Sequence, residues 1–207
     1  QDFNGSFVVF DIETTGFSAA NDKIIEIGAV RFDGLEETGR FSEFINPQRP
    51  IPFRIERLTG ISDSMVAGAL TADAVIPRFM KFCEGAVLVA HNAEFDTGFI
   101  RSNCASLGIA YDHTAIDTLP AARTFVPGLK NYQLQTVAEA LDCSKFNHHR
   151  AVDDAGVTAE IFIKLVEIFR NNGIYNLEDL AKKSRMPDDA VKRLRPSHIM
   201  LLAKNDI

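Results

Sequence analysis

Apolar residues along the first part of the chain follow the pattern of β-strands. Residues 6–11, residues 23–32 and the run from 40 to 45 are rich in β-branched and aromatic side chains and are joined by short, turn-prone segments. This pattern predicts three consecutive strands in an antiparallel meander. Residues 47–70 are interrupted by prolines and glycines, so we expect a loop with short helical turns there.

Further along the chain, apolar side chains recur every three or four residues, which is the period of a helix. The helical stripes lie at 75–83, 95–107, 134–141 and 157–168. We expect Leu107 on the inner face of the second of these helices. The continuously apolar run at 86–91 predicts a buried strand, and a further strand is expected at 114–117. Helices that alternate with strands predict an α/β fold with a mixed sheet and helices on its faces.

Composition excludes several classes of protein. The chain has 207 residues, 46% of them apolar, which suits one substantial domain with an appendage. No run approaches the roughly 20 apolar residues that span a bilayer, and no secretory signal is visible, so we expect no membrane partner. The three cysteines are Cys83, Cys104 and Cys143. Such widely spaced cysteines fit buried thiols in a reducing compartment, and we therefore expect a cytoplasmic protein.

The charge balance reverses near Gly173. Residues 175–207 carry 7 basic and 5 acidic side chains, which leaves a net charge of −8 on residues 1–174. We therefore expect a main domain over 1–174 and a short, mostly helical tail over 175–207. Because the chain lacks an initial Met and stops at Asn205-Asp206-Ile207, we expect it to be a piece of a longer protein.

Two carboxylates, Asp11 and Glu13, follow the apolar residues FVVF. The strand period places both on one face, with Cα atoms about 6.6 Å apart. As bare neighbours about 4 Å apart they would repel by around 4 kcal/mol at an effective dielectric of 20, whereas a divalent cation between them would turn repulsion into attraction. The alternative is that Asp11 caps a turn and that Glu13 is solvated.

Two further motifs, HNAEFD and HHRAVDDA, lie where helices are expected to begin. Asp96 falls in the first turn of its helix, where the helix dipole alone stabilises an acid, so a capping role is the alternative to metal binding. In the second motif the spacing leaves two pairs open, Asp153 or Asp154 and His148 or His149. His149 and Asp154 converge only if the His lies in a loop and the Asp inside the helix.

Considered together, these acids and the His are typical of a two-metal phosphodiester hydrolase. Two divalent ions about 3.5–4 Å apart can activate the attacking water and stabilise the leaving oxygen. Carboxylate ligands without Cys favour Mg²⁺ or Mn²⁺ over Zn²⁺. Such ions would also explain how an acidic domain binds phosphodiesters.

The motifs FVVFDIETTG, HNAEFD and HHRAVDDA resemble, in order and spacing, the three exonuclease motifs of the DEDDh family of 3′–5′ exonucleases. The resemblance covers roughly residues 6–170. It implies a ribonuclease-H-like fold with a five-stranded mixed β-sheet flanked by α-helices. The positions that match the catalytic, metal-binding acids of the family are Asp11, Glu13, Asp96 and Asp154. The family pattern also selects His149 over His148, as the general base, and Asp154 over Asp153.

The same resemblance implies contacts with the terminal nucleotide of the substrate. The residues implied to bind it are Ile12, Thr14, Leu58, Thr59 and Phe95. Asp117 matches a further acid with a supporting role, with a helix cap as the alternative.

Within this family, the main body is most similar to the proofreading domain of bacterial DNA polymerase III. The segment after Gly173 resembles the chain that follows the exonuclease in the PolC-type enzyme, so we expect the start of a polymerase segment there. The resemblance implies two Mg²⁺ or Mn²⁺ ions as cofactors and release of nucleoside 5′-monophosphates. The implied partners are a single-stranded or frayed 3′ end of DNA and the polymerase portion of the same or a partner chain.

Two alternatives follow from what the motifs leave open. They do not discriminate the sugar, so an exoribonuclease acting on RNA ends is the first. The second is a non-catalytic nucleic-acid-binding module on the same fold. The four intact acids argue against this module, because like charges crowded together are unfavourable without a cation.

Overall fold

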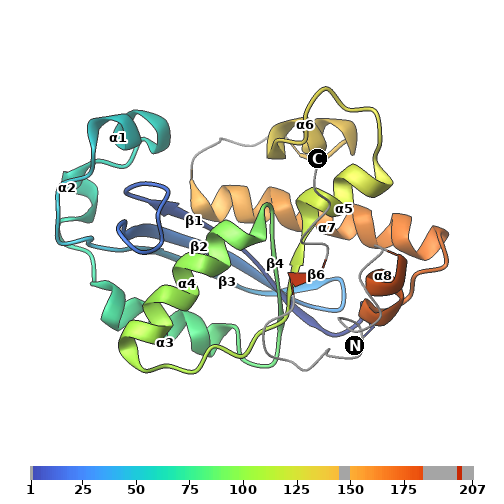
Figure 1. The fold of residues 1–207 in the computed structure, drawn as a ribbon, viewed down its shortest axis with the longest axis horizontal. Coiled ribbons are helices and arrows are strands. Elements are labelled where there is room, and N and C mark those ends of the chain that lie inside the picture. Colours follow the sequence, from blue (N-terminus) through green and yellow to red (C-terminus); the bar gives the residue numbers. More distant parts are fainter. Residues whose placement is uncertain (1, 145–149, 184–199, 202–207) are drawn as a thin grey trace.

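The computed structural model describes residues 2–144, 150–183 and 200–201 (Figure 1). In the described residues one sheet runs through the molecule in the order β3-β2-β1-β4-β5-β6. The strands are β1 (Ser6–Thr14), β2 (Ile24–Asp33), β3 (Glu36–Phe44), β4 (Val87–Ala90), β5 (Ala115–Asp117) and β6 (Met200–Leu201). β1, β2 and β3 pair antiparallel, and β4, β5 and β6 add in parallel to β1, so the sheet is mixed, as the sequence predicts.

Helices cover both faces of this sheet (Figure 1). They are α1 (Phe53–Thr59), α2 (Asp63–Val66), α3 (Ala72–Phe82), α4 (Ala93–Leu107), α5 (Thr118–Phe125), α6 (Leu134–Ala140), α7 (Ala151–Asn171) and α8 (Leu177–Lys183). The fold class predicted from the sequence is confirmed. Among the described helices, none is both long and apolar enough to cross a bilayer.

The alternation of side chains along β1 divides the core into two layers. Phe7 and Val9 point to one face and join a cluster with Phe162 and Leu165 of α7. The intervening residues, such as Phe10, point to the other face and pack with α3 and α4. Asp11 and Glu13 continue the first set, so both point to the α7 face, just beyond its apolar layer.

Several details differ from the sequence prediction. α5 begins directly after β5 and was not among the predicted helices, and its Pro120 is tolerated in the first turn because the N–H there needs no helical partner. Leu107 was expected on the inner face of α4 but is 37% exposed, because it is the last helical residue before Gly108. Cys104 takes the inner position instead and is fully buried.

The predicted tail begins with α8, whose Leu177 and Leu180 pack into the same core layer as α7. β6 then pairs with β5, which adds a short strand beyond the five expected. The boundary at residue 174 stays a prediction, and the rest of the tail, residues 184–199 and 202–207, lies outside the described residues.

Candidate active site

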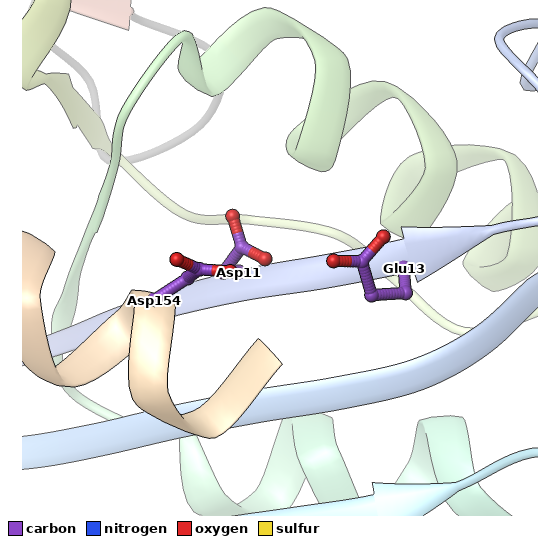
Figure 2. A group of neighbouring side chains, drawn as sticks. All are labelled: Asp11, Glu13 and Asp154. Atoms are coloured by element: carbon purple, nitrogen blue, oxygen red, sulfur yellow. The ribbon is translucent and has the colours of Figure 1, made fainter. Parts of the chain in front are cut away.

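Three carboxylates from two distant segments meet at the end of β1. One carboxylate oxygen from each of Asp11, Glu13 and Asp154 lies within 4.8 Å of those of the other two. Figure 2 shows the carboxylates of the two β1 residues directed toward the one carried by the first turns of α7. Asp154 is buried, whereas its neighbour Asp153 is exposed. The geometry therefore separates this pair of acids, which spacing alone leaves open.

The close approach of α7 to the sheet depends on a glycine in β2. Gly28 pairs with Asp11 across the strands. A Cβ atom at Gly28 would lie 2.0 Å from the backbone nitrogen of Val152 and 2.1 Å from the carbonyl carbon of Ala151. A side chain at this position would push the helix away from β1, so the absence of one allows Asp154 to reach Asp11.

Asp96 joins the site from the first turn of α4. Its Oδ1 accepts a hydrogen bond of 3.2 Å from the backbone N–H of Ile12, between the two β1 acids. The turn before α4 is held by Asp117, whose Oδ1 accepts 2.9 Å hydrogen bonds from the N–H groups of Asn92 and Leu119. Asp117 is therefore both the cap of α5 and the support of the turn that places Asp96.

Burial and mutual repulsion make these acids reluctant to ionise. Burial, followed by the charges of Asp96, Glu13 and Asp154, raises the pKa of Asp11 well above its ordinary value. Burial and the charges of Asp154 and Glu26 raise the pKa of Glu13 to about 8. Burial also raises the pKa of Asp96, partly offset by its backbone hydrogen bonds.

Clustered carboxylates of this kind fit hard divalent cations. Oxygen ligands are what Mg²⁺ and Mn²⁺ prefer, and a cation placed among these oxygens would remove the repulsion that raises their pKa values. Asp11, Glu13 and Asp154 could hold such an ion directly, and Asp96 lines the same cavity.

The acids line a cavity of about 430 Å³, which lies in the range typical of small-ligand sites, about 300–1,000 Å³. Ile12 and Phe95 form part of its wall, and Phe95 packs against Phe17 and Phe99 with ring centroids 6.5 and 5.1 Å away. The start of α6, with Gln133 and Gln135, also lines the cavity.

Three of the predicted nucleotide contacts are not among the residues that line this cavity in the described chain. Thr14 is buried, and its hydroxyl donates to the carbonyl of Gly16 at 2.5 Å. Thr59 is buried at the end of α1, and Leu58 beside it is 47% exposed. Their roles stay predictions. His149 lies outside the described residues.

Sequence reasoning missed two polar residues in and beside the cavity. His91 lines it and is held at both ring nitrogens, by the Thr118 hydroxyl at 2.9 Å and the Tyr132 carbonyl at 2.8 Å, and burial lowers its pKa. Glu26 is 1% exposed and lies beside Glu13 in the sheet. A lone acid within the apolar run KIIEIGAV was the available signal, since charged residues are rarely fully buried unless paired.

Comparison with known proteins places the chain in a family. A family model described as "Exonuclease" matches residues 8–162, and the chain belongs to this exonuclease family. The resemblance noted from the three motifs is thereby confirmed.

The similarity extends to particular proteins. Over 201 residues the chain is 46% identical to "DNA polymerase III PolC-type" of Caldanaerobacter subterraneus, and over 206 residues it is 47% identical to the protein of that name from Clostridium perfringens. These matches cover 97% and 99% of the chain but 14% of each relative, so the chain spans about one-seventh of their length.

Solved exonucleases share the fold. A structure of exonuclease X in complex with 5′ overhanging duplex DNA matches with a TM-score of 0.64 and 26% identity, covering 82% of this chain and 95% of that one. Exonuclease I matches with a TM-score of 0.70 and 20% identity, covering 81% of this chain and 43% of that one.

Proposed function

We propose that this chain is a divalent-metal-dependent 3′–5′ exonuclease that removes mispaired nucleotides from the end of a DNA primer during replication. It would hydrolyse the terminal phosphodiester and release nucleoside 5′-monophosphates. The observation that carries this proposal is the convergence of carboxylates from β1 and α7, within 4.8 Å, in a cavity large enough for a small ligand.

Each acid has a distinct place in the proposed chemistry. Asp11, Glu13 and Asp154 would hold the cations, and Asp96, which is tied to the backbone of β1, would complete the set. Two bound Mg²⁺ or Mn²⁺ ions would activate the attacking water and stabilise the leaving oxygen. His149 would accept the proton of that water, a role suited to an imidazole whose ordinary pKa is about 6.5.

The substrate assignment rests on the cavity and on the relatives. Phe95 offers an aromatic face on which any base can stack, and the backbone at Ile12 lies at the same wall. The curated relatives are DNA polymerases, and the exonuclease X structure holds duplex DNA with an overhang. These support a frayed 3′ end of DNA as the substrate and a polymerase portion as the partner. Attachment to a polymerase would supply a high effective concentration to a domain whose net charge is acidic.

The test is digestion of a 5′-labelled duplex with a recessed, mispaired 3′ end, with and without Mg²⁺. We expect stepwise shortening that requires the metal and yields nucleoside 5′-monophosphates. Asp154→Asn should abolish cleavage, because it removes a ligand charge from the cluster. Asp153→Asn is the matched control, since this neighbouring acid is exposed and should be dispensable.

Three results would overturn the proposal. Equal rates of digestion by the Asp154→Asn and Asp153→Asn variants would contradict the assignment of Asp154 to the active site. Digestion that starts from a 5′ end would contradict the proposed 3′–5′ polarity. Strong preference for an RNA oligonucleotide of the same sequence would favour an exoribonuclease instead.

A further inference from the structure

One buried carboxylate near the site has no part in the chemistry proposed above. Glu26 of β2 lies in a cross-strand row between Glu13 of β1 and Phe44 of β3. Its side chain points to the face covered by α7 and is almost fully buried. A buried acid so near other acids is unfavourable unless its own partners compensate for it.

Those partners all belong to the start of α7. Oε1 of Glu26 accepts hydrogen bonds from Nε and Nη2 of Arg150 at 3.0 and 2.9 Å. Oε2 accepts the backbone N–H of Ala151 at 3.0 Å. Arg150 is the N-cap residue of α7 but its own side chain makes no cap hydrogen bond. Glu26 therefore caps this helix from a distant strand and places a negative charge at the positive end of the helix dipole.

A further contact fixes the other side of the arginine. The guanidinium carbon of Arg150 lies 5.0 Å from the ring centroid of Phe44, within reach of a cation–π interaction. Arg150 is thus held between an aromatic ring and a carboxylate of adjacent strands. In the sequence it directly follows His149, the proposed base.

The anchored turn is the one that delivers Asp154. Asp154 follows Arg150 by four positions, about one helical turn, and the backbone between them lies against Gly28. We propose that Glu26 is a positioning residue for the metal site: by capping α7 from β2, it holds Asp154 where it can share cations with Asp11 and Glu13. This inference rests on the proposed function.

Two variants separate positioning from a simple effect of charge. Glu26→Gln keeps the shape but introduces an amide donor where both partners are donors. Arg150→Met keeps an unbranched side chain against Phe44 and removes the positive charge. If Glu26 acts by position, both variants should weaken metal binding. If Glu26 acts only through its negative charge, Glu26→Gln should weaken metal binding. Arg150→Met should then strengthen metal binding, because loss of the positive charge makes the site more negative.

The measurements are the Mn²⁺ concentration that gives half of the maximal thermal shift, and the rate of DNA digestion as Mn²⁺ is raised. We expect both variants to bind Mn²⁺ about 10- to 100-fold more weakly, as is usual when a group that orients a metal ligand is lost. Their rates should recover toward the parent rate at saturating Mn²⁺. Glu43→Gln is the control, because it breaks the ion pair with Arg78, which lies outside the cavity.

Each outcome decides the inference. Tighter Mn²⁺ binding by Arg150→Met, or unchanged binding in both variants despite a lower Tm, would overturn it. If Glu26→Gln does not fold, Arg150→Met decides alone, since its side chain is 41% exposed and its loss leaves no cavity in the core. A parent protein with neither a Mn²⁺ shift nor digestion would contradict the proposed function itself, whereas an active parent with indistinguishable variants would contradict only the role of Glu26.

Discussion

The repulsion among the acids predicts that one of them destabilises the protein when no metal is bound. Replacing Glu13 by Gln keeps the size of the side chain and removes its charge. We expect the metal-free Glu13→Gln variant to be more stable than the parent at alkaline pH, while it loses metal binding and activity. Such a trade is expected where a site is built for a cation rather than for stability.

The structure sets the magnitude. Two carboxylates 4.8 Å apart repel by about 3.5 kcal/mol at an effective dielectric of 20. The rise in the pKa of Glu13 from 4.5 to about 8 corresponds to about 5 kcal/mol. Because Glu13 is partly exposed and salt screens its interactions, we expect a measured gain of about 2–4 kcal/mol for the variant.

The sign of the pH dependence follows from the raised pKa. At a pH below 4.5, Glu13 is protonated in both the folded and the unfolded chain. As the pH rises from about 4.5 to about 8, the unfolded chain releases its proton while the folded chain retains it, so the folded parent loses stability across this range. The Gln variant does not titrate at this position. The gain in its free energy of unfolding over the parent should therefore be small at about pH 4.5 and complete at about pH 8.5.

Urea denaturation in EDTA, followed by circular dichroism at both ends of this range, measures the difference. Adding Mn²⁺ at about 100 times its Kd should stabilise the parent by about 2.7 kcal/mol and the variant by much less. Asp153→Asn, at an exposed acid, controls for net charge. A Glu13→Gln variant that is less stable than the parent in EDTA at about pH 8.5 would refute the reasoning.

Three further changes test how the site is placed. Gly28→Ala puts a Cβ 2.0 Å from the backbone of α7, so it should lower the free energy of unfolding, measured in urea, by about 1–3 kcal/mol and weaken Mn²⁺ binding. An unchanged Mn²⁺ titration would contradict the role of this close approach. Asp117→Ala leaves the N–H groups of Asn92 and Leu119 without their acceptor, at a cost in stability of about 1–3 kcal/mol, and should slow digestion. Asp117→Asn retains an acceptor and should lose less stability and less activity. Phe95→Ala should raise the KM for a DNA end about tenfold, consistent with the loss of one base–aromatic contact, and a fall in kcat alone would argue against stacking.

Local pattern was sufficient for most of the fold. The apolar alternation of β1 and the helical stripes of α3, α4, α6 and α7 follow from side-chain periodicity, which depends only on near neighbours in the sequence. α5 was missed because it is only eight residues long and its buried positions are the small residues Thr118, Ala121 and Ala122. The short β6 was missed because a two-residue strand leaves no pattern at all.

The kind of chemistry was also visible in the sequence, because acids that directly follow a buried strand or open a helix are unusual in type and place. Asp11, Glu13 and Asp96 could be named as candidates on that basis alone. The choice between Asp153 and Asp154 needed either a family pattern or the structure, since helix-start acids one residue apart look alike until the rotation of the helix is known.

How these groups meet depends on contacts between elements that are distant in the sequence. The 4.8 Å cluster requires α7 to lie directly on β2, and that depends on the missing side chain of Gly28 and on the buried contact between Glu26 and the start of the helix. Gly28 and Glu26 both lie more than a hundred positions before α7 in the sequence. Sequence periodicity carries information about which face a residue occupies, but the distance between two elements is set by the atoms that pack between them.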